Sequence, residues 1–166
     1  ATKYDQLKNP SRSGPAVRWI DVRGRTRRPG GSAVNDIEAE AVVSELRRLL
    51  IGQQYQGSVG VVTPFKAQAQ SIRDLAYKES ELADLLNRAE FESDTADGFQ
   101  GDERDVILFS PVAAPGITDG ATRFLNRERN RFNVAITRAR AALVIIGDRT
   151  LARSGDIEYL ANLSNY

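Results

Sequence analysis

Three short apolar runs, separated by segments with helical periodicity, constrain the fold of this chain more than any other feature. The runs cover residues 58–62 (Ser-Val-Gly-Val-Val), 106–109 (Val-Ile-Leu-Phe) and 142–146 (Ala-Leu-Val-Ile-Ile). Continuous apolar runs of this length are typical of strands buried on both faces of a parallel sheet. Strands that alternate with helices form βαβ units with right-handed crossovers. The sequence therefore predicts an α/β domain of three layers with a mostly parallel sheet.

The other elements follow from periodicity and capping signals. Asn35 and Glu38 have the spacing of a capping box and begin a helix predicted from about 34 to 51. Thr63 suits an N-cap and Pro64 a first helical position, so the next helix is expected over 65–77. The remaining predicted elements are strands over 16–22, 91–95 and 104–110, helices over 79–88 and 126–138, an irregular loop over 111–121, and a helical tail at the end of the chain.

The composition of the chain restricts the kinds of functional site and of protein that it can be. The 23 Lys and Arg residues nearly balance the 22 Asp and Glu residues, so any basic site must be local. The absence of Cys and His excludes disulfides, thiolate chemistry and histidine bases and argues against zinc. Without a signal-like segment or a long apolar run, we expect no membrane partner and no secretion. The expected location is cytoplasmic, or nucleoid or nuclear if the substrate is DNA.

The ends of the chain also carry expectations. Residues 1–15 are polar and show no period, so they are interpreted as a linker that leads into a single domain over 16–166. The chain begins with Ala and contains no Met, which predicts that it is a fragment of a longer protein.

The densest group of polar residues lies over 93–105, between two predicted strands. Gly98 and Gly101 bracket Phe99 and Gln100 and permit backbone conformations that a side chain would forbid. Ligands of parallel sheets gather at the carboxyl ends of the strands. The polar groups that follow predicted strands are Thr63, residues 95–103 and Asp148. We therefore expect a ligand site there.

The side chains of this region suit phosphates and sugars. Arg138 and Arg140, expected late in the helix that precedes the last predicted strand, carry the planar, permanently charged group that matches a phosphoryl group. Glu103 could accept hydrogen bonds from ribose hydroxyls, and the hydroxyls of Thr63 and Thr95 suit a nucleic-acid phosphate. No Gly-x-x-x-x-Gly-Lys-Ser/Thr motif and no magnesium-holding acidic pair occurs, so an ATP site is not expected from this chain alone.

Each of these assignments has an alternative without a ligand. Arg138 could be a surface arginine, Glu103 could pair with Arg104 or another arginine, and the two threonines could be cap or turn residues. Asp97, Asp102, Glu103 and Asp105 resemble the metal cluster of a nuclease, but ion pairs and turns are expected first, and no metal ligand is predicted.

The loop over 23–31 contains four arginines and has two interpretations. It could be a solvated loop, or it could be a basic arm that touches a phosphate backbone.

Three motifs resemble those of superfamily 1 helicases. Residues 60–68 (Gly-Val-Val-Thr-Pro-Phe-Lys-Ala-Gln) resemble motif IV, and residues 95–103 (Thr-Ala-Asp-Gly-Phe-Gln-Gly-Asp-Glu) resemble motif V. Residues 124–140 resemble motif VI, and Asn35-Asp36-Ile37-Glu38-Ala39 resembles the start of the first helix. Over about residues 16–150 the pattern is similar to the second RecA-like domain of the helicases related to the nonsense-mediated-decay RNA helicase.

The resemblance implies a RecA-like domain of the P-loop NTPase type that lacks its own P-loop. It implies the C-terminal motor domain of an ATP-dependent helicase or translocase, with ATP and Mg²⁺ held mainly by a missing N-terminal RecA-like domain. The track would be single-stranded DNA or RNA. The alternative is a non-catalytic module that binds nucleic acid or protein and retains the fold.

The resemblance also implies roles for single residues. Arg138 would be the arginine finger, Glu103 would contact the ribose, and Gly101 would let the backbone approach the nucleotide. Gln100 would help to couple the two sites, and Arg140 would supply supporting charge. The nucleic-acid contacts would come from Thr63, Pro64 and Thr95.

Overall fold

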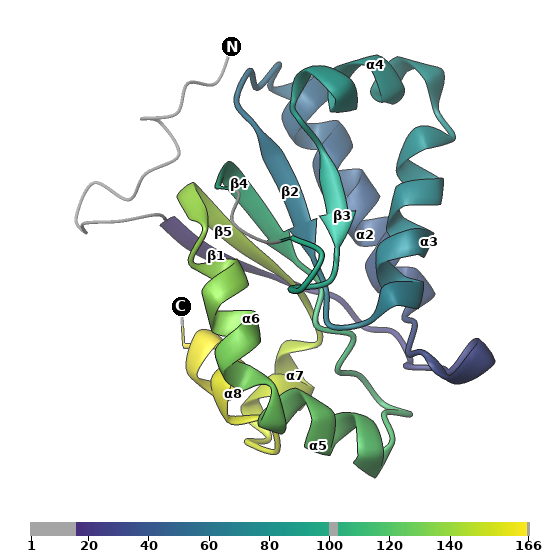
Figure 1. The fold of residues 1–166 in the computed structure, drawn as a ribbon, viewed down its shortest axis with the longest axis vertical. Coiled ribbons are helices and arrows are strands. Elements are labelled where there is room, and N and C mark those ends of the chain that lie inside the picture. Colours follow the sequence, from purple (N-terminus) through teal and green to yellow (C-terminus); the bar gives the residue numbers. More distant parts are fainter. Residues whose placement is uncertain (1–15, 100–102, 166) are drawn as a thin grey trace.

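The structure is a computed structural model that describes residues 16–99 and 103–165. The described residues form one five-stranded sheet in the order β1-β5-β4-β2-β3, and every neighbouring pair is parallel (Figure 1). The strands are β1 (Ala16–Asp21), β2 (Val59–Val62), β3 (Glu92–Asp94), β4 (Arg104–Phe109) and β5 (Ala139–Gly147). The predicted α/β class and parallel sheet are confirmed.

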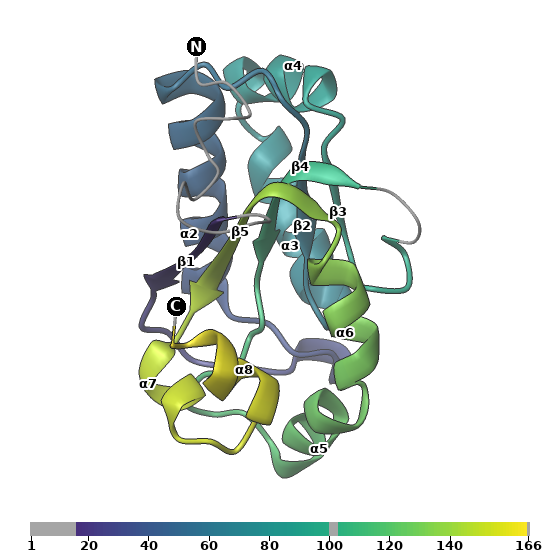
Figure 2. The same ribbon diagram turned by 90° about the vertical axis from the view of Figure 1, so that its left-hand side faces the viewer.

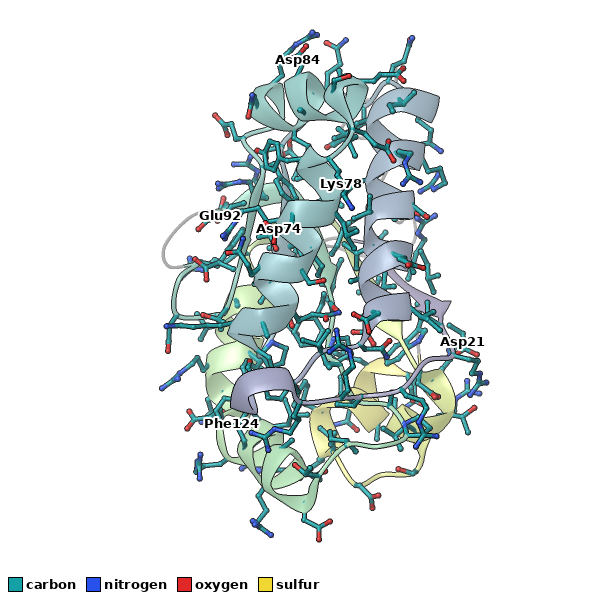
Figure 3. All side chains as sticks on the ribbon, turned by 90° about the vertical axis from the view of Figure 1, so that its right-hand side faces the viewer. Asp21, Asp74, Lys78, Asp84, Glu92 and Phe124 are labelled. Atoms are coloured by element: carbon teal, nitrogen blue, oxygen red, sulfur yellow. The ribbon has the colours of Figure 1, made fainter. Side chains whose placement is uncertain are left out.

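Helices cover both faces of the sheet, as the prediction of three layers requires. One face carries α2 (Asp36–Arg47), its π-helical continuation η2 (Arg48–Gly52), α3 (Lys66–Tyr77) and α4 (Ser80–Arg88). Figure 3 views the molecule from this side, with α2 and α3 next to each other in front of the sheet. The other face carries α5 (Asp119–Arg127), α6 (Arg129–Ile136), α7 (Arg149–Arg153) and α8 (Glu158–Leu163).

The strands divide their side chains between two cores, one under each layer of helices. In β5, Leu143 and Ile145 pack with α5 to α8, whereas Val144 and Ile146 pack with α2 to α4. This period of two explains the continuous apolar runs, because both faces of a central strand are buried. Within the part of the chain that the structure describes, no helix has the length and apolarity needed to cross a bilayer.

The start of α3 differs from the prediction. Thr63 is not an N-cap, because its backbone N–H donates to Asp94 O at 3.2 Å and so continues the pairing of β2 with β3. The helix begins at Lys66 after Phe65, and the N–H of Ala67 donates to Ser32 Oγ at 3.2 Å. A cap from a distant loop has replaced the local cap that the sequence suggested.

The helix predicted over 126–138 is confirmed over 129–136 as α6, but residues 126 and 127 belong to a separate helix, α5, which the sequence did not predict. Two helices, α5 and α6, meet at Glu128, whose φ of −95° and ψ of 17° interrupt the helix. The first of them begins at an N-cap, Thr118, whose side chain accepts from the N–H of Ala121 at 3.1 Å. This cap lies inside the region expected to be irregular, and Gly120 in the first turn had weakened the helical pattern.

The predicted capping box of α2 is half formed. Asn35 caps the helix by accepting from the N–H of Glu38 at 3.0 Å, but the Glu38 carboxylate accepts from Asn35 Nδ2 at 3.4 Å and not from the backbone N–H of Asn35. The fully buried Glu38 carboxyl also accepts from Ser110 Oγ at 2.6 Å and from Val112 N at 2.8 Å. The N–H of Asn35 instead donates to Gln68 Oε1 at 3.0 Å, and Gln68 Nε2 donates to Ser110 Oγ at 3.2 Å. This polar network ties α2 and α3 to the end of β4.

The buried position of Glu38 makes the stability of the fold depend on pH. Burial raises the pKa of Glu38 from 4.5 to about 8, and the hydrogen bonds from Ser110 and Val112 only partly offset it. Since the folded pKa exceeds the unfolded one, the free energy of unfolding should fall from about pH 5 to pH 8, by about 1.4 kcal/mol per unit.

We predict that Glu38→Gln flattens this dependence, because the amide carries no charge at any pH. Chemical denaturation at several pH values between 5 and 8 measures the slope. The exposed Glu40 on the same helix provides the control Glu40→Gln, which should keep the wild-type slope. Equal slopes for the wild type and Glu38→Gln would contradict the assignment.

Candidate nucleotide and nucleic-acid sites

The predicted site residues divide between the two edges of the sheet. Because all described strands are parallel, their carboxyl ends share one edge and their amino ends share the other. Thr63 and Thr95 follow β2 and β3 at the carboxyl edge. Glu103 directly precedes β4 and Arg140 is the second residue of β5, so both lie at the amino edge. The expectation that residues 95–103 lie together at the carboxyl ends is therefore wrong for Glu103.

Arg138 lies in the turn that joins α6 to β5, and not within a helix as predicted. Its carbonyl accepts a hydrogen bond from the N–H of Arg104 at 3.2 Å, which fixes the turn to the start of β4. The side chain is half-buried, and its guanidinium makes no hydrogen bond or ion pair within residues 16–99 and 103–165. A charge held on a fixed backbone without a counter-ion is available to an anion.

Arg140, in contrast, is neutralised by neighbouring carboxylates. Its Nε donates to Asp105 Oδ1 at 3.0 Å, and its Nη1 lies 3.7 Å from Glu103 Oε2. Asp105 also accepts from the N–H of Ser58 at 2.9 Å. Glu103 thus has the arginine partner expected of it without a ligand, yet it is exposed, and the contact to a ribose stays a prediction.

Phe99 anchors the segment between β3 and β4. The ring is buried in the core against Gly60 of β2, and the guanidinium of Arg104 lies 5.3 Å from the ring centroid. Arg104 is held by Glu90 O at 2.9 Å and by Glu92 at 3.3 Å. The sequence interpretation missed this anchor, although a lone aromatic residue in a glycine-rich polar segment is a usable signal.

A groove of about 250 Å³ separates the segment after β3 from α6. Figure 2 shows the end of β3 and the start of this segment beside α6. An ion pair, Asp97 Oδ2 to Arg131 Nη1 at 2.9 Å, joins the two walls. Val134 on α6 is 55% exposed and lies at the groove. The groove is lined by Ala96, Asp97, Phe99, Arg131, Val134, Ala135 and Arg138.

The residues predicted to touch nucleic acid differ in accessibility. Thr63 is fully buried, and its Oγ1 has no hydrogen-bond partner among the described residues. Pro64 beside it is buried as well. Thr95 is half-buried, and its Oγ1 accepts from the N–H of Gly98 at 3.4 Å. Thr95 is therefore the more accessible hydroxyl, and the contacts of all three residues stay predictions. Gln100 and Gly101 lie outside the described residues.

The arginine-rich loop after β1 is tied to the rest of the molecule. Arg23 bridges Asp21 at 2.9 Å and Asp148 at 3.0 Å. Arg27 pairs with Asp36 at 2.7 Å. Asp148, which follows β5, also caps α7 by accepting from the N–H of Leu151 at 3.0 Å, so its role is structural.

Arg28 of the same loop donates to Thr118 Oγ1 at 3.2 Å, beside the segment η1 (Pro29–Gly31). Three of the four arginines thus hold positions within the fold.

The acidic residues near the candidate site are used in ion pairs and hydrogen bonds. Asp97 pairs with Arg131, and Asp105 pairs with Arg140. Over residues 16–99 and 103–165, no three acidic side chains converge as a metal site requires. The ion pairs that we expected in place of a metal cluster are present for Asp97, Glu103 and Asp105, whereas Asp102 lies outside the described residues.

Comparison with known families identifies the chain. A family profile described as "AAA domain" matches residues 2–150, which is most of the sequence. The chain belongs to this family. Together with its relatives, the match shows a RecA-like domain of the superfamily 1 helicase type, in the branch that includes Sen1.

The relatives carry helicase names. Helicase sen1 of Schizosaccharomyces pombe is 31% identical over 161 residues, 95% of this chain and 9% of that protein. DNA polymerase alpha-associated DNA helicase A of Saccharomyces cerevisiae is 36% identical over 137 residues, 82% of this chain and 19% of that protein. An uncharacterized ATP-dependent helicase of Methanocaldococcus jannaschii is 32% identical over 143 residues, 85% of this chain and 19% of that protein. The AAA domain thus spans less than a fifth of each of these relatives.

The close contact between Gly60 and Phe99 predicts that a methyl group added at position 60 destabilises the fold. A Cβ at position 60 would overlap the Phe99 ring, so Gly60→Ala should lower the free energy of unfolding by about 1–3 kcal/mol. Chemical denaturation measures the loss. In the control Gly52→Ala, a Cβ would approach no atom closer than 4.0 Å, and stability should be unchanged or slightly higher. Equal stability of the two variants would contradict the packing described for Phe99.

Proposed function

We propose that this AAA domain is the C-terminal motor domain of an ATP-dependent helicase or translocase. In this proposal ATP binds between the amino edge of the sheet and an N-terminal RecA-like domain of the same protein. The observation that carries the proposal is the guanidinium of Arg138, which is half-buried, fixed through its backbone to β4, and without a counter-ion in the described part of the chain. The helicase names of the relatives support it.

Arg138 acts as the arginine finger of the shared site. Phosphoryl transfer spreads negative charge over the equatorial oxygens of the γ-phosphate, and a planar guanidinium stabilises that charge. The partner domain holds ATP and Mg²⁺, and Glu103, which is exposed at the same edge, contacts the ribose. Arg140 forms an ion pair with Asp105, so it supplies supporting charge at this edge and does not contact phosphate directly.

The exposed valine on α6 supports a partner on this side of the molecule. Val134 borders the groove next to Arg138 and is open to solvent in the isolated domain. Burying such a side chain against another domain removes apolar surface from water, which favours association. The finger and the apolar contact then belong to one interface.

The nucleic-acid contact is proposed for the opposite edge of the sheet. Thr95 offers a half-exposed hydroxyl there, and Thr63 and Pro64 lie buried at the end of β2. A single strand bound through its phosphates would be held without sequence preference and would be released by salt. The track is single-stranded DNA or RNA.

The test of the proposed function is Arg138→Ala in the full-length protein. We expect nucleic-acid-stimulated ATP turnover to fall on the order of 10³–10⁵-fold, the range found when arginine fingers are absent. Arg138→Lys should rescue little, because an ammonium group cannot reproduce the planar contacts. Steady-state phosphate release in the presence of single-stranded DNA or RNA measures the effect.

The matched control is Arg153→Ala, which removes an exposed arginine at the end of α7, a helix that carries none of the residues proposed for either site. Its turnover should equal that of the wild type. Unchanged turnover in Arg138→Ala would exclude the finger and favour a non-catalytic module that retains the fold.

A further inference from the structure

The ion pair between Asp97 and Arg131 joins the segment after β3 to the helix that leads to Arg138. The distance from Asp97 Oδ2 to Arg131 Nη1 is 2.9 Å. Asp97 lies two residues after Thr95 and two residues before the buried Phe99. Arg131 lies in the first turn of α6, and Arg138 lies in the turn that follows the last residue of the helix, Ile136. The pair therefore spans the groove between the two candidate sites.

The walls of the groove have no other side-chain hydrogen bond or ion pair between them in the part of the chain that the structure describes. Phe99 fixes the far end of the segment in the core, and the Arg138 turn is fixed to β4. Besides the packing of Ala96 and Phe99 in the same core as α6, the pair of Asp97 and Arg131 is the polar link between the two walls among the described residues. Arg131 also contacts Glu128 at 3.4 Å, which orients its guanidinium along the helix.

We propose that the Asp97–Arg131 ion pair is a positioning contact that couples nucleic-acid binding at Thr95 to the placement of Arg138. A strand bound at Thr95 shifts the segment after β3, and the pair passes that shift to α6 and its following turn. The inference rests on the proposed function and assigns the coupling to two residues that touch neither ligand.

The exposure of the pair suits a coupling role. The side chains of Arg131 and Asp97 are 46% and 59% exposed. Exposed ion pairs contribute little to folding and are made and broken at small cost. The expected effect of losing the pair is therefore a two- to five-fold change in coupling, with the fold intact.

The experiment is a double-mutant cycle in the full-length protein with Asp97→Asn, Arg131→Gln and the double variant. The measured quantity is the ratio of ATP turnover with and without single-stranded nucleic acid. We expect each single variant to lower the ratio two- to five-fold, and the double variant to match the single variants, because the contact is lost only once. The melting temperature should change by less than about 4 °C.

The matched control is the ion pair of Arg47 and Glu79, which lies at 2.8 Å with side chains 42% and 43% exposed, on the opposite face of the sheet. Arg47→Gln and Glu79→Gln should leave the ratio unchanged. An unchanged ratio in the Asp97 and Arg131 variants, independent effects that multiply in the double variant, or a parallel loss of melting temperature would each overturn the coupling role. A wild-type protein without any stimulation would overturn the proposed function and the inference with it.

Discussion

The common direction of the strands is the constraint on which the rest of this structure depends. In a parallel sheet, a chain that leaves one strand at the carboxyl edge must return to the amino edge before the next strand begins. Most connections here return through helices. The connection from β3 to β4 contains no helix in its described part, and it begins at Thr95 and ends at Glu103. One short segment therefore touches the edge proposed for nucleic acid and the edge proposed for nucleotide.

A segment that contacts both sites must be fixed in position and still be accessible to ligands. The ring of Phe99 fixes it, because Gly60 has no side chain and the ring therefore packs directly on β2. Arg104 closes over the ring and begins β4, whose first N–H bonds the carbonyl of Arg138. Glu103 at the end of the segment is exposed and Arg138 in the turn is half-buried, while the backbone carbonyls of both accept hydrogen bonds from Arg104. Preorganised charges of this kind suit phosphoryl transfer, where positioning and electrostatics do most of the catalysis.

The sequence predicted what depends on local pattern and failed where distant contacts decide. The sequence predicted the apolar runs of β2, β4 and β5, because the two cores bury both faces of these strands. It predicted α2, α3 and α4 from the helical spacing of their apolar residues. The start of α3 was wrong because Thr63 pairs with β3 and Ser32 supplies the cap, and neither contact is visible locally. The break at Glu128 is likewise a tertiary fact. Among residues 16–99 and 103–165 the Arg138 guanidinium has no partner whereas Arg140 pairs with Asp105, and this difference between residues two apart could come only from the structure.

The central claim is that this domain supplies one wall of an ATP site and cannot hydrolyse ATP alone. The most direct test is ATP turnover by this chain, alone and mixed with the preceding part of its parent protein, with and without single-stranded DNA and RNA. The account predicts no turnover by the isolated chain and stimulated turnover by the mixture, with the better stimulator identifying the track. Turnover by the isolated chain, or none by a mixture whose folded parts associate, would contradict it.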